Sequence, residues 1–367
     1  MSKRIKIFSE KLDKGTLDQF YSAMNQPFVV RGALMPDAHV GYSLPIGAVV
    51  ATDGIILPSW VGYDIGCGMC AAMTTLMKED ILPFRKEIFQ SVYRAVPTGF
   101  AHNKRPETWD HEKIPMTHAL QKIFGKDGLC QIASLGGGNH FIEISHDEDG
   151  HVWVVVHSGS RNVGHSVATH YMKLASGTGR ASEGHFGFPV KSGEGRDYIT
   201  DMKFCLEFAL ENRKRIIERV LREIYHYAKK GSAPQTLEFI NRNHNHAEEK
   251  DGMWIHRKGA THAEAGMAGV IPGNMRDGSF IVVGKGNPES LYSSSHGAGR
   301  ALSRTQAKDK ISMDDFRAQL EGVTARVERA TLDEAPSAYK DIFEIMKLQE
   351  NLVEVQRHLT PIINIKG

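Results

Sequence analysis

The chain of 367 residues has only four cysteines and no long apolar run. Four cysteines in a chain of this length do not form a disulfide framework, and they are typical of a reducing compartment, where a cysteine can bind a metal. No apolar stretch approaches the ~18–20 residues that a membrane helix needs. The first residues, MSKRIKIFSEKLDKG, are charged and lack the apolar segment of a secretory signal. We therefore expect a cytoplasmic protein without a membrane partner.

Two signatures of nucleotide chemistry are also absent. The sequence has no GxxxxGK[ST] loop, so it is not an ordinary P-loop NTPase. It has no Lys-x-Asp-Gly, which argues against the enzymes that attach a nucleotide to a lysine. A net charge of +2 excludes a polycation, so any binding of nucleic acid must come from a local basic patch.

The pattern of apolar residues predicts an α+β fold in a single domain over residues 1–367. Strands are expected within 45–75 and at 151–157 and 279–285, and helices at 201–230, 312–330 and about 337–358. Gly231 would end the first helix, and Ser312 would cap the second. Strands and helices do not alternate regularly, which disfavours a doubly wound sheet.

Side chains that bind metals stand in glycine-rich junctions. They are Asp64 and Cys67 in GYDIGCG, His140 after three glycines, His157 at the end of VWVVV, and His244 in NRNHNHAE. Together they could bind one or two divalent ions, and thiolate and imidazole favour a transition metal over Mg²⁺ or Ca²⁺ without separating Zn²⁺, Mn²⁺, Fe²⁺ and Co²⁺. A single buried histidine is more often a hydrogen-bonded core residue. Several such junctions in one chain favour a metal site.

Asp37 and His39 in PDAHVG form a weaker candidate of the same kind. Their spacing puts both side chains on one face of a strand. They could support the metal ligands, contact a substrate, or only form a turn. Cys70, Cys130 and Cys205 have no neighbours that resemble ligands, and we expect them in the core.

The segment SSSHGAGR is the densest polar stretch, and packing explains it poorly. Its small residues let a ligand approach His296, Arg300 could bind a phosphate in bidentate fashion, and the amides of 297–299 could form an anion nest. Arg257 and Lys258 add charge upstream, although a solvated basic loop is the alternative. If a nucleotide is attached to this protein, His296 is the obvious nucleophile.

Taken together, these segments closely resemble the RtcB family of RNA ligases. The matching motifs run in order along nearly the whole chain: MPDAHVG, VGYDIGCG, LGGGNHFIE, VVHSGSR, HNHAE, HRKGAT, IPGNM, SSSHGAGR, APSAYKD and the terminal KG. Ten motifs in one order are very specific. The resemblance implies the family's α+β fold, with mixed sheets and surrounding helices around a central metal site.

By position, the resemblance also implies two Mn²⁺ ions and GTP as a co-substrate. The manganese ligands would be Asp64, Cys67, His140, His157 and His244, and His296 would take up GMP. The nucleotide would contact Asn139, His140, Phe141, Ile142, Glu143, His244, Asn245, Pro272, Gly273, Asn274, Met275, Ser279, His296, Gly297, Ala298, Gly299, Tyr339 and Lys366. A penultimate Lys366 could hydrogen-bond the guanine edge.

The implied reaction joins an RNA 3′-phosphate or 2′,3′-cyclic phosphate to a 5′-hydroxyl end. A neutral nitrogen of His296 attacks the α-phosphorus of GTP and releases pyrophosphate, and GMP then passes to the 3′-phosphate. The 5′-hydroxyl attacks this activated end and GMP leaves, while a cyclic phosphate must first be opened. Which RNA is joined, in splicing or in repair, and whether an accessory activator takes part stay open.

This chain departs from the family at a few positions. Asn274 stands where serine is usual, Tyr42 and Ser43 stand where a lysine and small residues are usual, and the segment between Cys67 and His140 is short. These departures affect the expected choice of RNA more than the expected catalysis.

Two other functions remain open on the sequence. A metal-dependent phosphodiesterase or nuclease could use the same metal ligands without a nucleotide, although SSSHGAGR and Lys366 disfavour it. A non-catalytic RNA-binding protein could use the basic residues of the helix at 201–230, which are Arg213, Lys214, Arg215, Arg219 and Arg222. Acidic residues interleave with them, so a solvated helix face is favoured over an RNA platform.

Overall fold

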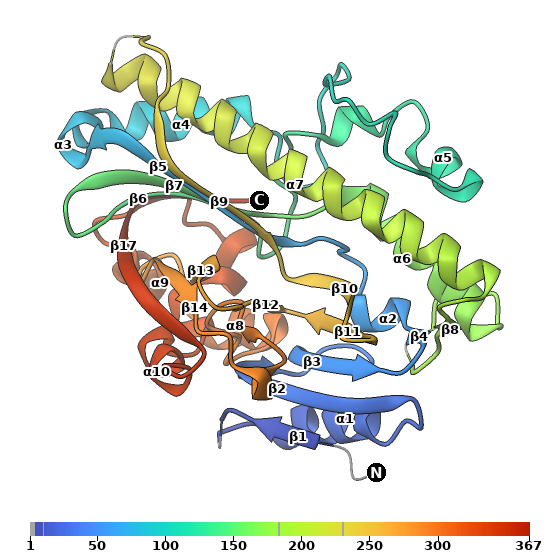
Figure 1. The fold of residues 1–367 in the computed structure, drawn as a ribbon. Coiled ribbons are helices and arrows are strands. Elements are labelled where there is room, and N and C mark those ends of the chain that lie inside the picture. Colours follow the sequence, from blue (N-terminus) through green and yellow to red (C-terminus); the bar gives the residue numbers. More distant parts are fainter. Residues whose placement is uncertain (1–3, 10, 183, 230) are drawn as a thin grey trace.

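The computed structural model describes residues 4–9, 11–182, 184–229 and 231–367, in which helices surround two larger β-sheets (Figure 1). The smaller of the two has the strand order β1-β2-β3-β11-β10, with β1 parallel to β2 and the other neighbours antiparallel. Its strands are β1 Arg4–Ile7, β2 Val29–His39, β3 Ile46–Thr52, β10 Asn245–Lys250 and β11 Met253–Lys258. This sheet joins the N-terminal part of the chain to a hairpin from its second half.

The larger sheet has the order β13-β14-β17-β6-β7-β5-β9, with antiparallel neighbours, and β16 pairs in parallel with β17. Its strands are β5 Gly68–Met77, β6 Phe141–His146, β7 His151–Ser158, β9 Thr236–Asn243, β13 Ala268–Pro272, β14 Ser279–Gly284, β16 Thr324–Ala325 and β17 Val353–Lys366. The first strand of this order, β13, also contacts β5 and β9 at the other end, which shows that the sheet curls.

Helices and short strand pairs complete the described chain. The helices are α1 Lys14–Met24, α2 Pro58–Val61, α3 Lys78–Ile81, α4 Arg85–Ala95, α5 His118–Phe124, α6 Arg161–Ser176, α7 Gly193–Ala228, α8 Arg304–Lys310, α9 Met313–Gln319 and α10 Ile342–Leu348. Five 3₁₀ turns lie at Leu82–Phe84, Leu129–Gln131, Pro288–Ser290, Arg329–Glu334 and Pro336–Ala338. The short strands β4 Ile55–Ile56 and β8 Phe188–Pro189 pair with each other, as do β12 Ala260–His262 and β15 Ser293–Ser295. None of the helices in the described part of the chain combines the length and the apolar character that crossing a bilayer requires.

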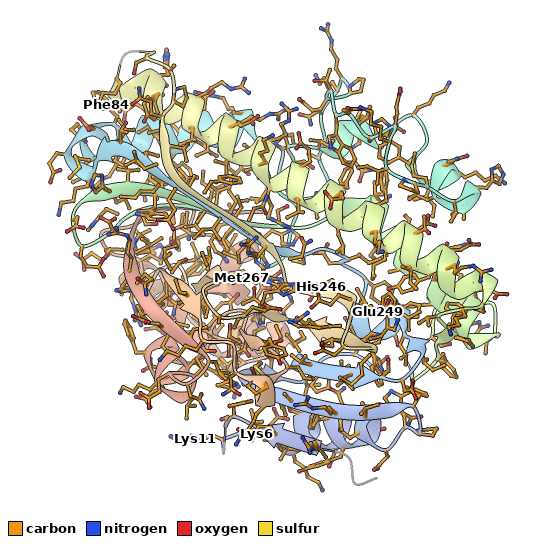
Figure 2. All side chains as sticks on the ribbon, viewed as in Figure 1. Lys6, Lys11, Phe84, His246, Glu249 and Met267 are labelled. Atoms are coloured by element: carbon orange, nitrogen blue, oxygen red, sulfur yellow. The ribbon has the colours of Figure 1, made fainter. Side chains whose placement is uncertain are left out.

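The long helix α7 packs with α4 against one face of the larger sheet, and Figure 2 shows side chains filling this layer. Strand β7 shows how the sheet divides its side chains, because successive residues point to opposite faces. Val152, Val154 and Val156 belong to the core beneath α4 and α7, whereas Trp153 and Val155 belong to the core of the inner face. The same alternation directs the last side chain of the series, that of His157, to the inner face.

The α+β prediction is confirmed, as are the strands at 151–157 and 279–285. Helix α7 confirms the helix at 201–230 but begins at Gly193, and Lys230 lies outside the described residues. Gly231 has a positive φ of 84°, which fits its predicted role after the helix.

Two helix predictions are wrong over much of their length. Ser312 caps α9 as expected, but this helix ends at Gln319, and Gly322 follows with φ +90°. The predicted helix at 337–358 is reduced to α10, and the chain from Val353 onward is strand β17. That strand lies between β14 and β6, so pairing with distant segments overrides the local preference for helix.

Candidate active site

Four neighbouring strands of the larger sheet bring the predicted metal ligands to one end of its inner face. His140 precedes β6, His157 lies near the end of β7, Cys67 precedes β5, and His244 follows β9. The register aligns these ends, because Gly68 is paired with both Ser158 and Asn243. Residues that are far apart in the sequence are thereby adjacent.

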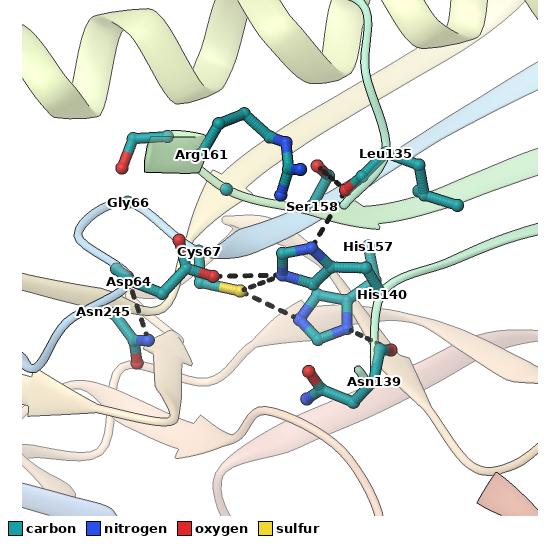
Figure 3. A network of polar contacts seen from close by, with 12 residues as sticks. Asp64, Gly66, Cys67, Leu135, Asn139, His140, His157, Ser158, Arg161 and Asn245 are labelled. Carbon is teal, nitrogen blue, oxygen red and sulfur yellow. Dashed lines mark hydrogen bonds and ion pairs between the residues drawn. The ribbon is translucent and has the colours of Figure 1, made fainter. Parts of the chain in front are cut away.

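The side chains of the five predicted ligands meet at short distances, and Figure 3 shows four of them, Asp64, Cys67, His140 and His157. The Cys67 sulfur lies 3.2 Å from Nε2 of His157 and 3.4 Å from Nε2 of His140. Nε2 of His140 lies 3.0 Å from Oδ2 of Asp64. Nε2 of His157 lies 3.3 Å from Nε2 of His244. Two groups of three ligands result, Asp64–Cys67–His140 and Cys67–His157–His244, and they share the cysteine.

Backbone carbonyl groups determine which ring nitrogen faces the centre of this cluster. His140 donates from Nδ1 to the carbonyl of Leu135 at 2.9 Å, and His157 donates from Nδ1 to the carbonyl of Asn139 at 3.1 Å (Figure 3). A carbonyl oxygen only accepts, so each Nδ1 carries the hydrogen and each Nε2 presents a lone pair. Metal-binding histidines are oriented by the same kind of support.

The donor set fits a divalent transition metal. Burial lowers the pKa of His157 well below its ordinary value, and the neighbouring His140 and His296 lower it further, so the ring is neutral. Burial likewise raises the pKa of the Cys67 thiol, and its single proton cannot satisfy two imidazole lone pairs and the carboxylate of Asp64. A cation removes this conflict. Ligand atoms bound to one ion at bond lengths of about 2.0–2.3 Å lie about 3–4 Å apart, which matches the spacing here.

Arg213 of α7 holds the ligand-bearing segments together. Its guanidinium is fully buried and donates to the carbonyls of Gly66 and Ser158, at 2.8 and 2.9 Å. It also donates to the side-chain oxygens of Asn241 and Asn243, at 2.7 and 2.6 Å. These acceptors flank Cys67, His157 and His244 in the sequence. One buried arginine therefore positions three predicted ligands.

The predicted nucleophile, His296, follows β15 and is held by Asp37 of β2. Nδ1 of His296 donates to Oδ2 of Asp37 at 2.7 Å, and the backbone N–H of His296 donates to the same oxygen at 3.2 Å. Burial raises the pKa of Asp37, but the charge and hydrogen bond of His296 outweigh this and leave it lowered. An ionised carboxylate only accepts, so Nδ1 keeps its hydrogen whether or not the ring is charged, and in the neutral ring Nε2 carries the lone pair.

This contact gives Asp37 a role other than the three left open for PDAHVG, because it supports the predicted nucleophile and not a metal ligand. His39 donates from Nδ1 to the carbonyl of Asp37 at 3.0 Å, and burial lowers the pKa of His39 to about 4. Gly299, with φ +73°, lies so close to the Asp37 carbonyl that a Cβ would overlap it. The His296 ring lies 4.9 Å from the ring of His244, which joins the nucleophile to the metal-ligand groups.

A cavity of about 620 Å³ contains these groups, within the ~300–1,000 Å³ range of small-molecule sites. The predicted nucleotide contacts that line it are Asn139, Phe141, Glu143, His244, Asn245, Pro272, Gly273, Asn274, Met275, His296, Gly297, Ala298, Gly299, Tyr339 and Lys366. The side chain of Ile142 lies on the other face of β6, in the core beneath α7. Ser279 is buried and donates to Glu143 at 3.1 Å, and His140 lies in the metal-ligand group.

One end of the cavity is formed by β6, β17 and the turns before α10. Nζ of Lys366 lies 3.0 Å from Oε2 of Glu334 and 5.1 Å from the centre of the Phe141 ring. Tyr339 donates to the same Glu334 oxygen at 2.5 Å. Burial raises the pKa of Glu143 to about 7, even though hydrogen bonds from Ser279 and Ser145 and the charge of Lys366 lower it. These groups can donate to and accept from the edge of a flat base.

Two of the predicted phosphate contacts of SSSHGAGR, the side chain of Arg300 and the amide of Ala298, are bonded within the protein. Arg300 lines the cavity, but its guanidinium lies 3.2 Å from Glu334 and donates to the carbonyls of Leu302 and Asp333. The amide of Ala298 donates to the carbonyl of Pro272 at 3.0 Å. The bidentate phosphate contact at Arg300 therefore stays a prediction, and it would compete with these bonds. Lys258 does line the cavity.

Arg257, also predicted to bind phosphate, is buried outside the cavity, at a third group of side chains that could bind a metal. This group is His246, Glu248 and His262, and Figure 2 shows His246 near the middle of the molecule. The Arg257 guanidinium lies 3.2 Å from Nε2 of His246 and 2.5 Å from Oε1 of Glu248. The buried positive charge of Arg257 would repel a metal ion at this group. The carboxylate of Glu248 neutralises the charge of Arg257 instead. Arg257 in turn donates to Ser293, near the nucleophile, at 2.8 Å.

Three of the five basic residues named above on α7 are engaged within the protein. Arg213 is buried, Arg215 pairs with Glu211 at 2.6 Å, and Arg219 donates to the carbonyls of Ala95 and Ala133. One hint of the role of Arg213 is visible in the sequence, since it stands within the apolar stripe of the helix beside Ile216 and Ile217. The expectation for Cys70, Cys130 and Cys205 is confirmed, because all three are buried and unpaired.

Comparison with known proteins points to one family. The family model described as tRNA-splicing ligase RtcB matches residues 19–125 and 113–367. The RNA-splicing ligase RtcB of Escherichia coli K12 is 36% identical over 95% of this chain and 93% of its own length. The tRNA-splicing ligase RtcB of Thermococcus kodakarensis is 29% identical over 91% of this chain and 86% of its own length.

Proposed function

Since the chain belongs to the RtcB family of RNA ligases, we propose that it joins RNA 2′,3′-cyclic phosphate or 3′-phosphate ends to 5′-hydroxyl ends, with GTP, through a histidine–GMP intermediate. The observation that carries this proposal is the Asp37–His296 pair, which presents a lone pair on Nε2 beside a cluster of metal ligands. Residues from both larger sheets line the cavity, which supports a single catalytic domain over residues 1–367.

Two Mn²⁺ ions would be held by the two ligand groups that share Cys67. When bound, such ions neutralise phosphate charge and polarise phosphorus–oxygen bonds. The cysteine, three histidines and one carboxylate form a softer ligand set than Mg²⁺ prefers. Sharing of one thiolate between two groups supports two ions rather than one.

The protein's own groups account for the transfer of GMP. Nε2 of His296 forms a bond to the α-phosphorus of GTP, and the bond from that phosphorus to the pyrophosphate oxygen breaks. The proton stays on Nδ1, where the buried charge of Asp37 stabilises the positive charge that develops on the ring. Transfer of GMP to the RNA 3′-phosphate breaks the nitrogen–phosphorus bond and restores the lone pair. The 5′-hydroxyl then attacks the activated 3′-phosphorus, the bond from that phosphorus to the GMP phosphate oxygen breaks as the phosphodiester forms, and the hydroxyl proton leaves with GMP.

The guanine base would bind at the end of the cavity formed by Phe141, Glu143, Tyr339 and Lys366. Lys366 can donate to a guanine oxygen, and the carboxylate of Glu143 can accept from the guanine amino and imino groups. The aromatic ring of Phe141 can stack on the base. Asn274 replaces the usual serine of the family in the loop that lines this end, so we expect it to take the place of that hydroxyl.

The test uses α-labelled GTP and Mn²⁺ with the full chain. We expect a protein-bound GMP that is labile in acid and stable in alkali, as a phosphoramidate is. His296→Ala should abolish both this adduct and ligation while Mn²⁺ binding is retained. His226→Ala, which changes an exposed histidine on α7, is the matched control and should behave as the wild type.

Ligation at the normal rate by His296→Ala would contradict the proposal. A wild-type protein that forms no adduct but cleaves RNA would instead be the metal-dependent phosphodiesterase considered above.

A further inference from the structure

A row of aromatic side chains lies at the rim of the cavity, on elements other than those that form its guanine end. Tyr42 lines the cavity yet is 60% exposed, so its ring lies between the interior and solvent. It meets Tyr63 edge to face, with ring centres 6.3 Å apart and an interplanar angle of 88°. Tyr63 stacks on His165 of α6, with centres 5.1 Å apart and an angle of 21°.

This row leads from solvent to the metal-ligand groups. Tyr63 also lines the cavity and directly precedes Asp64 in the chain. Nζ of Lys258, another lining residue, lies 5.9 Å from the centre of the Tyr42 ring. An exposed aromatic ring next to a cation, at the opening of a reactive cavity, has both features that bind single-stranded nucleic acid: a flat stacking surface and charge for the backbone.

Packing does not explain the position of Tyr42. A ring that is 60% exposed buries little apolar surface, and the guanine end of the cavity already has its own ring, Phe141, with its own cation, Lys366. The cavity thus carries two separate pairs of an aromatic ring and a lysine. A ligase of this kind must hold a nucleotide and an RNA end together.

We propose that Tyr42 stacks on a base of the single-stranded RNA end that enters the cavity, with Lys258 facing the adjoining phosphate. This inference rests on the proposed RNA substrate and adds the residue that holds it. Because every base has a flat face, the contact should tolerate any base but require that one is present.

The experiment measures binding of a short fluorescent single-stranded RNA with a 3′-phosphate to the Mn²⁺-loaded protein without GTP. A second set of RNAs lacks the base at each of the last nucleotides in turn. Tyr42→Ala should weaken binding of the complete RNA by about 10-fold. Tyr42→Trp should keep or improve it, and Tyr21→Ala is the matched control, because Tyr21 is a 45% exposed tyrosine outside the cavity lining.

The decisive comparison is between variants and abasic RNAs. In the wild type, removing the base at one position should weaken RNA binding about as much as Tyr42→Ala does. In Tyr42→Ala, removing the same base should weaken binding no further, because the two changes remove one contact. Wild-type affinity in Tyr42→Ala, or equal sensitivity of both proteins to every abasic position, would overturn the inference. Formation of the GMP adduct needs no RNA, so a wild type without adduct refutes the proposed chemistry alone.

Discussion

Asp37→Asn is the most direct test of how the nucleophile is prepared. The substitution keeps the size of a fully buried side chain and removes only its charge and one of its oxygen atoms. The amide oxygen of the substituted side chain could still accept from Nδ1 of His296. Its NH₂ group could instead donate to Nδ1, and the ring would then carry its hydrogen on Nε2 and lose the lone pair that attacks phosphorus.

The magnitude follows from the contacts that Asp37 makes. One carboxylate oxygen accepts from the ring at 2.7 Å and from the backbone at 3.2 Å. A hydrogen bond to a charged group contributes about 1.5–3 kcal/mol. If the ring contact is strongest when the imidazole becomes positive, its loss slows formation of the GMP adduct by about 10- to 150-fold.

The assay is the initial rate of adduct formation from α-labelled GTP at saturating Mn²⁺. Mn²⁺ affinity should change little, since Asp37 is not among the metal ligands, and this separates support of the nucleophile from a general loss of structure at the site. Asp53→Asn, in the exposed bend after β3, is the matched control. Adduct formation by Asp37→Asn at the wild-type rate would refute the reasoning.

Three further predictions test the surroundings of the site. The pKa of Glu143 is raised from 4.5 to about 7, so between these pH values the folded state keeps a proton that the unfolded state releases, and the free energy of unfolding falls as pH rises. Glu143→Gln should therefore stabilise the protein by about 3 kcal/mol above pH 7 and by little near pH 4.5. Equal effects at the two pH values would contradict this reasoning. Arg213→Lys should lower the free energy of unfolding in urea by about 3 kcal/mol or more and weaken Mn²⁺ binding, because a lysine cannot reach the four acceptors. Unchanged metal affinity would show that the segments that carry the ligands keep their positions without Arg213. Lys366→Met should weaken GTP binding about 10-fold with little effect on unfolding, since Glu334 keeps its ion pair with Arg300, and undiminished GTP affinity would argue against a guanine contact.

The sequence by itself singled out the candidate metal ligands that the fold brings together, because each stands in a short motif. Asp64, Cys67, His140 and His157 lie at glycine-rich junctions or at the end of an apolar strand, and such patterns depend on nearby residues alone. The same holds for β7, whose continuous apolar run VWVVV predicts the strand, although only the structure shows which face carries His157. Local signals of this kind survive in any fold that keeps the segment.

The tertiary structure decided everything that depends on pairs distant in sequence. Asp37 meets His296 across 259 positions, so PDAHVG could not show its role. The chain from Val353 onward is a strand because β14 and β6 pair with it on either side. Arg300 forms an ion pair with Glu334, which lies 34 positions further along the chain. A hydrogen bond or an ion pair is determined by distance in space, and only the folded chain brings these partners within about 3 Å of one another.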